Sequence, residues 1–349
     1  MQLVAYGAQD IYLTGNPQIT FFKVVYRRHT NFAMESIQQT FNGTVGAGNR
    51  VTCTVSRNGD LVHRMWVQAD VTSTGAVTKA GHQLLSEMEL EIGGQRVDKH
   101  YADWLEVWSQ LTLSEGVRAG YETMTLNASA THTNATAYVP LQFWFCRNPG
   151  LALPLIALQY HEVKVNITFG SQSTVTLNSA SLWVDYIYLD TDERRRFAQV
   201  SHEYLIEQLQ FTGDETTYGR SRLNFNHPVK ELVWVGTTGT WGAYQSDLTN
   251  AKLQLNGHDR FAQRLGSYFN LVQPYQHHTR VPSDGGVFVY SFALKPEEHQ
   301  PSGTCNFSRI DNATLNMTWG TNPTVLKVFA VNYNVLRVMS GMGGLAYSN

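Results

Sequence analysis

Twelve histidines make a metal centre the first chemistry to consider in this 349-residue chain. A metal site of the kind that β-sandwiches carry needs two histidines one residue apart on a strand, with a nearby glutamate and a later histidine. The sequence contains no such His-x-His triplet. His277 and His278 are adjacent, as are His161 and Glu162, and neighbouring side chains on a strand point to opposite faces. We therefore expect neither a metal nor a cofactor.

Hydrolytic chemistry has equally little support. A Ser-His-Asp triad is compatible with the spacings, but the Gly-x-Ser-x-Gly turn that presents a nucleophilic serine is missing. Glu87, Glu89 and Glu91 alternate with apolar residues along one predicted strand, so we expect them to form its exposed face rather than an acid pair. The glycine-rich stretch 341–344 lacks the Lys-Ser/Thr of a phosphate-binding loop, and we expect a flexible, close-packing tail there. The prediction is a non-enzyme without catalytic residues.

The charge balance predicts no direct contact with nucleic acid. Lys and Arg total 26 and Asp and Glu total 28, so the formal net charge is −2. Nucleic-acid binding needs a basic surface to neutralise phosphates. The one basic cluster, 194–196, follows acidic residues in a short predicted helix at 190–198 and has no accompanying aromatic strip. We expect this helix to begin at Asp190 or Thr191 and its arginines to form surface or interdomain ion pairs.

Two asparagines are candidate modification sites. Seven Asn-x-Ser/Thr triplets occur, at Asn42, Asn127, Asn134, Asn166, Asn306, Asn312 and Asn316. Asn127 and Asn134 lie in a long polar stretch, whereas Asn166, Asn312 and Asn316 fall in predicted strands. Residues 1–7 lack the basic and apolar regions of a signal peptide, so we expect no secretory route to glycosylation. Asn127 and Asn134 are the candidates that we retain.

The cysteines and the hydropathy pattern predict a protein that folds in a reducing compartment. Cys53, Cys146 and Cys305 are odd in number and far apart, which fits buried free thiols better than disulfides. No apolar run approaches the ~20 residues that a membrane-spanning helix needs. We expect folding in the cytosol and no transmembrane segment.

The elements that would position all these side chains occur twice. Residues 87–92 alternate as a strand, Gly93-Gly94 provides a tight hairpin turn, and apolar residues at 104, 107, 108 and 111 predict an amphipathic helix. Residues 252–255 alternate again, Asn256-Gly257 is a strong hairpin signal, and apolar residues from 261 to 272 follow at helical spacing. One supersecondary unit therefore repeats, which predicts two similar domains. The dipeptide Trp-Val also occurs in each predicted domain, at Trp66-Val67 and Trp234-Val235, and supports the repeat.

Composition and turn signals make both domains β-rich. Only 15% of residues are charged, while aromatic residues reach 12%, and Thr, Asn, Ser and Gly are abundant. The other expected strands are 32–41, 51–55, 61–71, 138–145, 160–169, 181–189, 204–211, 231–235, 287–294, 306–319 and 325–339. Residues 72–81, 112–137, 236–250 and 270–286 are expected to be loops. About eight strands per domain suit a jelly roll as well as an immunoglobulin-like sandwich.

Several long motifs resemble the major capsid proteins of large double-stranded DNA viruses, most of all those of algal phycodnaviruses and chloroviruses. The matching stretches are 6–10 (YGAQD), 14–23 (TGNPQITFFK), 26–32 (YRRHTNF), 148–163 (NPGLALPLIALQYHEV), 332–337 (NYNVLR) and 340–347 (SGMGGLAY). They extend over the whole chain. The resemblance implies an all-β fold of two tandem eight-stranded jelly rolls, a double jelly roll, with short helices in the connections.

The resemblance also implies a division of the chain and a function. Residues 1–31 would be an N-terminal arm, 32–190 the first jelly roll, 191–202 a connecting helix or linker, and 203–349 the second jelly roll. The chain would be a structural protein of the virion that forms homotrimers with pseudo-hexagonal outline, assembled in the host cytoplasm. Its partners would be itself, neighbouring capsomers and minor capsid proteins. The apolar character of residues 19–26 agrees with an arm that neighbouring subunits cover.

Two alternatives remain open from sequence. The first is a paralogous minor capsid protein, because the loops 236–250 and 270–286 are short. The second belongs to a different class, a carbohydrate-binding β-sandwich or a hydrolase that uses one of the loop ends. The missing acid pair and metal cluster argue against the second alternative.

Overall fold

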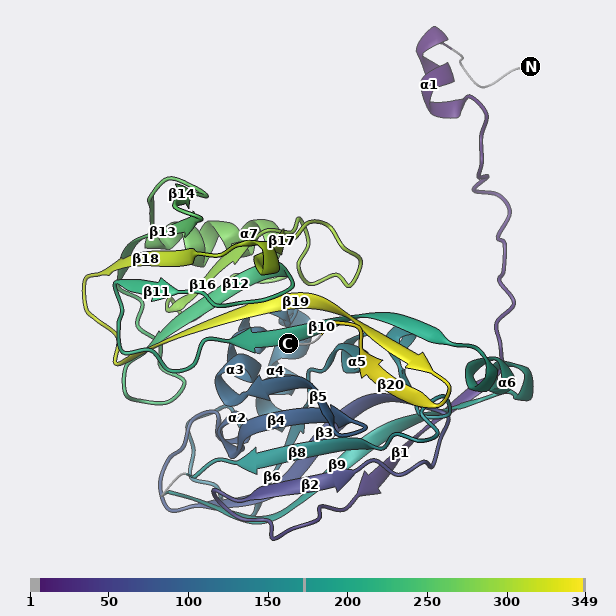
Figure 1. Ribbon diagram of the computed structural model, residues 1–349, viewed down its shortest axis with the longest axis horizontal. Coiled ribbons are helices and arrows are strands. Elements are labelled where there is room, and N and C mark those ends of the chain that lie inside the picture. The colour runs from purple at the N-terminus through teal and green to yellow at the C-terminus, as the bar shows by residue number, and fades with distance from the viewer. Residues whose placement is uncertain (1–6, 172–173, 348–349) are drawn as a thin grey trace. The chain divides into compact units, whose positions relative to one another are not determined.

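The computed structural model of the chain describes residues 7–171 and 174–347. It divides into two compact units, Met1–Asn31 and Phe32–Asn349. The first unit contains a 3-10 turn, η1 (Ala8–Asp10), and the four-residue helix α1 (Ile11–Thr14). All the sheets lie in the second unit (Figure 1).

The N-terminal half of the second unit is a sandwich of two antiparallel sheets. One sheet has the spatial order β1 (Phe32–Gln39), β9 (Val175–Leu189), β3 (Leu61–Ser73) and β6 (Ala135–Pro140), with β7 (Leu153–Pro154) also paired to β3. The other sheet has the order β2 (Arg50–Thr54), β8 (Val163–Phe169), β4 (Leu85–Ile92) and β5 (Gln95–Tyr101). Counted along the chain, the main strands are therefore ordered 1-8-3-6 and 2-7-4-5.

The C-terminal half repeats this arrangement. Its larger sheet has the order β10 (His202–Phe211), β19 (Val325–Met339), β12 (Pro228–Thr237) and β16 (Val287–Ser291), with β17 (Cys305–Asn306) and β20 (Met342–Leu345) at its margins. The facing sheet has the order β11 (Arg220–Arg222), β18 (Ala313–Trp319), β13 (Leu248–Leu255) and β14 (His258–Asp259), with β15 (Arg264–Leu265) paired to β13. The main strands again follow the orders 1-8-3-6 and 2-7-4-5. Two facing four-stranded sheets with this connectivity make each half an eight-stranded jelly roll.

The two predicted hairpin turns form as their residues require. Gly93 and Gly94 have φ angles of 58° and 84°, and they join β4 to β5. Asn256 and Gly257 have φ angles of 50° and 81°, and they join β13 to β14. Positive φ at both central positions defines the type I′ turn, whose twist matches that of the flanking strands. The repeated supersecondary unit is thus confirmed at its hairpins.

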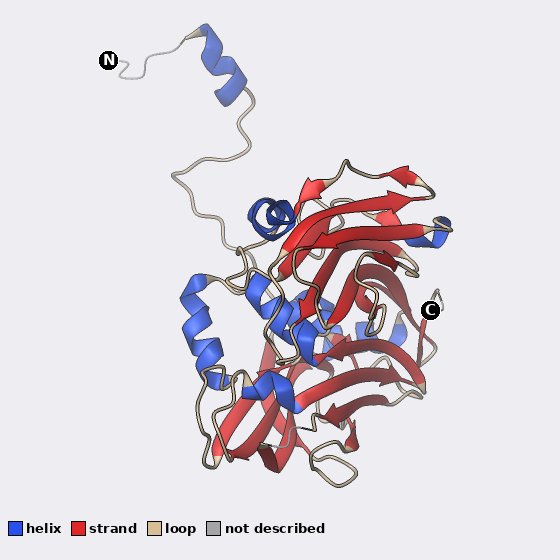
Figure 2. Cartoon of the chain, turned by 90° about the vertical axis from the view of Figure 1, so that its left-hand side faces the viewer, coloured by secondary structure: helices blue, strands red, loops and turns tan. Residues whose placement is uncertain are grey.

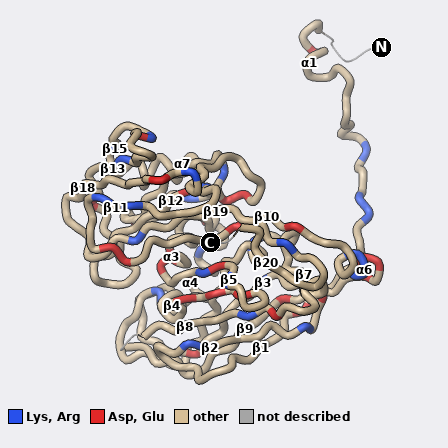
Figure 3. The backbone as a smooth tube through the Cα atoms, viewed as in Figure 1, with Lys and Arg blue, Asp and Glu red and all other residues tan. Residues whose placement is uncertain are grey.

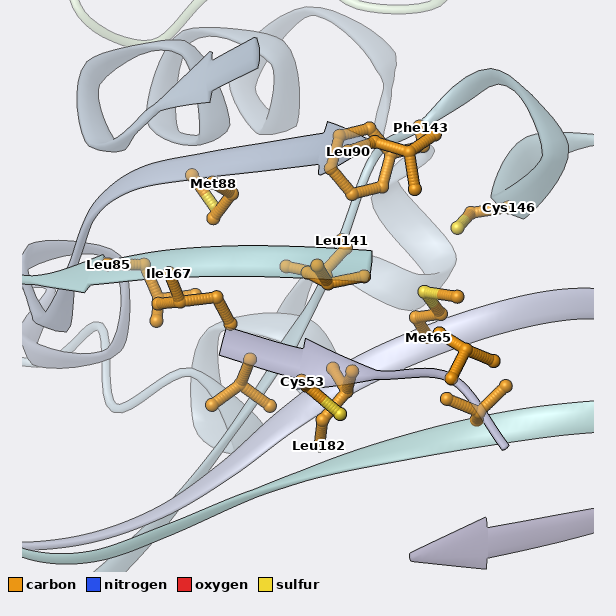
Figure 4. Close-up of a cluster of buried hydrophobic side chains, with 14 of the residues drawn as sticks. Cys53, Met65, Leu85, Met88, Leu90, Leu141, Phe143, Cys146, Ile167 and Leu182 are labelled. Atoms are coloured by element: carbon orange, nitrogen blue, oxygen red, sulfur yellow. The ribbon is translucent and has the colours of Figure 1, made fainter. Parts of the chain in front are cut away.

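Each jelly roll encloses its own apolar core. In the first, Met88 and Leu90 of β4 and Ile167 of β8 face Met65 of β3 and Leu182 of β9 from the opposite sheet (Figure 4). A second cluster fills the space between the sheets of the C-terminal jelly roll, with Trp234, Phe269 and Phe288 among its largest members. Each fully buried side chain of this size contributes about 1.5–3 kcal/mol. These cores hold the sandwiches together without a disulfide, since Cys53, Cys146 and Cys305 are free thiols.

Short helices occupy the connections between strands (Figure 2). They are α2 (Ala80–Leu84), α3 (Ala102–Thr112), α4 (Glu115–Met124), α5 (Trp144–Arg147), α6 (Thr191–Gln199) and α7 (Gln273–His277), with the π-helical turn η3 (Tyr268–Val272) and the 3-10 turns η2 (Pro149–Leu151) and η4 (Phe307–Arg309). The helix predicted after Asp190 is confirmed as α6, and the Asp190 carboxylate accepts a hydrogen bond from the backbone N–H of Thr191 at 2.7 Å.

Four segments differ from the sequence predictions. Residues 112–137 are not a loop, because α4 and the start of β6 lie there, and α5 replaces the end of the strand expected at 138–145. The helix expected from residue 261 begins only at 268, after the short strand β15. The glycine-rich tail packs closely, as expected, but it does so as a strand: β20 pairs with the end of β19, and the Gly343 carbonyl lies 2.9 Å from His161 Nδ1 of the first jelly roll.

The helix α3 connects the two jelly rolls. Trp104, Val107, Trp108 and Leu111 all lie in one buried cluster with residues of the C-terminal jelly roll, including Phe329, Val233 and Val289. This contact covers the outer face of the β10-β19-β12-β16 sheet. It also corrects the predicted Trp-Val equivalence: Trp234 points into the second core and Val235 outwards, whereas Val67 points into the first core and Trp66 outwards.

Candidate interaction surfaces

The most reaction-like cluster of side chains joins three helices. His82 of α2 places Nδ1 2.8 Å from Glu106 Oε2 of α3 and Nε2 2.8 Å from the Tyr121 hydroxyl of α4. Lys79 Nζ lies 2.8 Å from the other Glu106 oxygen. Burial acts to raise the pKa of Glu106, but the hydrogen bond and charge of His82 and the charge of Lys79 outweigh it and lower the pKa to about 2. Since Glu106 and Tyr121 occupy both His82 nitrogens, the cluster holds the helices together and leaves no nitrogen to activate a nucleophile.

A second buried histidine binds two carboxylates. His278 Nε2 lies 2.8 Å from Glu231 Oε2 of β12, and Nδ1 lies 2.9 Å from Glu297 Oε1. Burial acts to lower the pKa of His278, but the two carboxylates outweigh it and raise the pKa to about 9. The imidazolium therefore compensates the fully buried Glu231 carboxylate. His277, its neighbour, points elsewhere, with Nδ1 3.0 Å from the Leu294 carbonyl.

A third buried ion cluster lies between the two jelly rolls. Glu207 of β10 contacts Lys230 Nζ of β12 at 2.8 Å and Arg147 Nη2 of α5 at 2.9 Å. Burial acts to raise the pKa of Glu207, but these cations together with His299 lower it to about 2. Arg147 thus ties the first jelly roll to the second.

Among residues 7–171 and 174–347, no group of three or more His, Cys, Asp or Glu side chains is arranged to hold a metal ion.

The three glutamates of β4 do not form a uniformly exposed face. Met88, Leu90 and Ile92 point into the core as predicted, but Glu89 is only 8% exposed. Its carboxylate pairs with Arg50 and, at 3.3 Å, with Lys99 Nζ on the neighbouring strand. The prediction was wrong for Glu89 because these long basic side chains lie over it and exclude water.

The arginine cluster of α6 makes the ion pair expected of it. Arg194 Nε lies 2.9 Å from Asp60 Oδ1, and the buried Asp60 also accepts a hydrogen bond from the backbone N–H of Leu189 at 2.9 Å. Arg194 therefore fastens α6 to the first jelly roll. Along the backbone of both jelly rolls, Lys and Arg positions are interspersed with Asp and Glu positions (Figure 3).

The two candidate glycosylation sites have different surroundings. Asn134, just before β6, is exposed, and its Oδ1 accepts hydrogen bonds from Thr72 Oγ1 at 3.1 Å and Asn178 Nδ2 at 3.3 Å. Asn127 is half-buried, and its Oδ1 is enclosed without a hydrogen-bond partner. Asn166 is buried in β8, as expected for a strand position.

The largest exposed apolar side chains gather in the N-terminal unit. Phe21, Phe22, Val24, Val25 and Tyr26 are each between 79% and 97% exposed. Monomeric soluble proteins rarely expose so continuous an apolar stretch. The apolar run at residues 19–26 had already indicated this surface in the sequence. A separate question is whether any helix could span a membrane. In the described part of the chain, no helix is both long enough and apolar enough to do so.

A second apolar surface lies on the outer face of the β1-β9-β3-β6 sheet. Trp66 of β3 and Trp183 of β9 stack with nearly parallel rings whose centroids lie 6.2 Å apart, and the exposed Tyr138 lies on the neighbouring strand β6. A hollow of about 840 Å³ lies beside Trp66, Tyr138 and Pro140, and side chains of α3 and α4 line its other side. Sequence analysis missed this surface, because which side of β3 faces outwards depends on how the strands pair.

The chain contains two jelly rolls whose strands have the same spatial order, so its fold is a double jelly roll. Its exposed apolar side chains are typical of a protein that associates with other subunits. The sequence comparisons agree. Residues 20–190 match the family profile described as "Major capsid protein N-terminus", and residues 193–344 match "Large eukaryotic DNA virus major capsid protein". The major capsid protein of Pyramimonas orientalis virus is 63% identical, over 100% of this chain and 99% of that protein. That of Paramecium bursaria Chlorella virus 1 is 49% identical with the same coverage.

The solved structures lead to the same family. The PBCV-1 VP54 crystal structure, fitted into a cryo-EM reconstruction of the virophage Sputnik, superposes with a TM-score of 0.87 at 46% identity, over 95% of this chain and 100% of that chain. The Faustovirus major capsid protein, 11% identical, shares the fold with a TM-score of 0.78, over 96% of this chain and 94% of that chain. The chain belongs to the major capsid proteins of large eukaryotic DNA viruses, a family of structural proteins rather than enzymes.

Proposed function

We propose that this chain is the main building block of an icosahedral virus shell and that three copies form one capsomer. The observation that carries the proposal is the repeated 1-8-3-6 and 2-7-4-5 strand order within one chain. Three chains with two similar jelly rolls each supply six similar units, which approximate six-fold symmetry and tile a shell with hexagonal packing. The 63% identical relative named a major capsid protein supports the same role.

Within this proposal, the chain divides at the boundaries expected from sequence. Residues 1–31 are an arm for contacts between capsomers, 32–190 and 203–349 are the two jelly rolls, and 191–202 connect them. The exposed apolar side chains from Phe21 to Tyr26 support the first assignment, since a surface of this kind needs a covering partner. The division into two jelly rolls is supported by the apolar core that lies between the two sheets of each sandwich.

The proposal extends to the surroundings of the shell. The connections 72–81, 112–137, 236–250 and 270–286 emerge at the end of the capsomer that faces the outside of the shell, and Asn134 is the better placed of the two candidate glycosylation sites because it is exposed. Neighbouring capsomers and minor capsid proteins are the further partners of the chain, and assembly takes place in the host cytoplasm.

Electron microscopy of the purified full-length protein tests the proposal. Negative-stain class averages should show particles of near-hexagonal outline, with three-fold symmetry at higher resolution. Particles with only two lobes, each the size of one jelly roll, would contradict the capsomer assignment.

A further inference from the structure

The contact between the two jelly rolls of one chain is made by a helix from a defined place in the fold. The helix α3 lies between the fifth and sixth main strands, β5 and β6, of the first jelly roll. It covers the outer face of the second jelly roll, where its Trp104 ring lies 5.5 Å from Phe329. Phe329 pairs with Val233 on β12, and Val233 pairs with Val289 on β16, so one apolar row crosses the sheet beneath the helix.

The second jelly roll has a helical segment in the same place. The segment η3–α7, residues 268–277, lies between its fifth and sixth main strands, β14 and β16. Its inner side is fixed: Phe269 is buried in the core, and Asn270 Nδ2 donates to the Val287 carbonyl at 2.9 Å. Its outer side carries Leu271 and Tyr275, one helical turn apart and 51% and 80% exposed. An apolar helix face of this kind has no partner within the described chain.

The first jelly roll has the matching open face. Its β1-β9-β3-β6 sheet is the counterpart of the sheet that α3 covers, since both have the order 1-8-3-6. The row on its outer face runs from Trp183 through Trp66 to Pro140, which pair across β9, β3 and β6. Tyr138 beside this row is 41% exposed, and a hollow of about 840 Å³, bounded by Trp66, Tyr138 and Pro140 on one side and by α3 and α4 of the same chain on the other, leaves room for side chains from another molecule.

We propose that the η3–α7 segment of one chain docks on this outer face, the Trp66–Trp183–Pro140 row, in a second copy of the chain. The proposal rests on the homotrimer described above and identifies its contact surface. In this arrangement the first jelly roll's helix covers the second jelly roll within a chain, and the second jelly roll's helix covers the first jelly roll of the next chain. A head-to-tail contact repeated in this way closes a ring when the last chain meets the first.

The chemistry of the two faces fits their different roles. The face covered by α3 is lined by valines and Phe329 and is buried as soon as the chain folds. The open face combines two tryptophans and a tyrosine with polar Gln68 and Asp70, and such a mixture remains soluble until a partner arrives. Trp and Tyr are also the side chains that most often dominate binding energy at the centre of an interface.

Site-specific photocrosslinking tests the contact. The full-length protein carries p-benzoylphenylalanine in place of Tyr275, is irradiated as the purified oligomer, and is analysed by peptide mass spectrometry after its mass is measured by light scattering. We expect crosslinks between chains to peptides from β3, β6 or β9. The matched control carries the same group at Tyr160, an aromatic residue of similar exposure outside α7; it should not yield these peptides.

The possible outcomes separate this inference from the proposed function. A trimer whose Tyr275 position crosslinks to other surfaces would overturn the docking inference and leave the capsomer intact. A monomer without crosslinks between chains would overturn both. As an independent check, Tyr275→Arg should keep the far-ultraviolet circular dichroism of the folded chain and raise the dissociation constant of the oligomer by about tenfold or more, whereas Tyr160→Arg should not change it. An unchanged dissociation constant for Tyr275→Arg would contradict the inference.

Discussion

The ring of Trp104, on α3 of the first jelly roll, lies 5.5 Å from the ring of Phe329, on β19 of the second. Trp104 is 3% exposed and Phe329 is fully buried. The helix α3, which follows β5 of the first jelly roll, therefore covers the outer face of the β10-β19-β12-β16 sheet of the second jelly roll. The two jelly rolls share buried surface, and their association is part of the folding of the chain.

Replacing Trp104 by alanine should lower the free energy of unfolding by about 3 to 5 kcal/mol, because the substitution leaves a large cavity between α3 and the sheet. Denaturant unfolding followed by tryptophan fluorescence measures this loss. Tyr160→Ala is the matched control, since Tyr160 is an aromatic residue that is 75% exposed and its replacement should cost clearly less. Equal losses for the two variants would show that α3 does not carry the contact between the jelly rolls.

Local signals in the sequence predicted the parts of the fold that depend on neighbouring residues. The turns at Gly93-Gly94 and Asn256-Gly257 and the start of α6 at Asp190 need only backbone preferences and a nearby side chain. The helix α4 escaped prediction because it contains Gly116 and Gly120, which weaken the helical signal. The contact of its Tyr121 with His82, a residue far away in sequence, helps to hold it in place.

The buried charge of His278 should make stability depend on pH on the alkaline side. Its pKa is raised from the ordinary 6.5 to about 9 in the folded chain. A raised folded-state pKa means that the stabilisation is complete below about pH 6.5 and is lost as the pH rises through 9. The free energy of unfolding should fall by up to about 3 kcal/mol over this interval. Denaturant unfolding at a series of pH values and fixed protein concentration measures the slope.

The variant His278→Gln is the control for that slope. It should be less stable than the wild type at pH 6.5, because Glu231 is then buried without a cation, and its stability should change little between pH 6.5 and 9. A wild-type curve that is flat over this interval, or a variant with the same slope, would contradict the role of His278.

Glycosylation should discriminate between the two candidate asparagines. In protein isolated from virions, we expect the sugar on Asn134, which is exposed, and none on Asn127, whose side chain is half-buried with an enclosed Oδ1. Peptide mapping by mass spectrometry locates the modification, and Asn134→Gln removes it. Finding the sugar on Asn127, or none on either residue, would refute this assignment.

The N-terminal arm should matter for the shell and not for the fold. Deleting residues 1–25 removes most of the exposed apolar side chains of the first unit and leaves both cores intact. The truncated chain should therefore keep the thermal unfolding midpoint of the intact protein within a few degrees and fail to assemble closed shells. Shells of normal size and yield, seen by electron microscopy, would contradict the role of the arm.

Features that depend on strand pairing lay beyond the sequence. Alternation along β4 correctly placed Leu90 in the core, but it said nothing about the basic side chains that bury Glu89 on the other face. The Trp-Val pairs looked equivalent, yet Trp66 and Trp234 face opposite sides of their sheets. The open face with Trp66 and Trp183 could therefore not be predicted, although both tryptophans are plain in the sequence.

The mass of the protein in solution tests the capsomer most directly. Light scattering of the full-length chain after gel filtration, at micromolar concentration, should give three times the chain mass of 39.3 kDa. A value of 39.3 kDa that persists as the concentration rises would mean that the chain does not assemble by itself into the proposed building block.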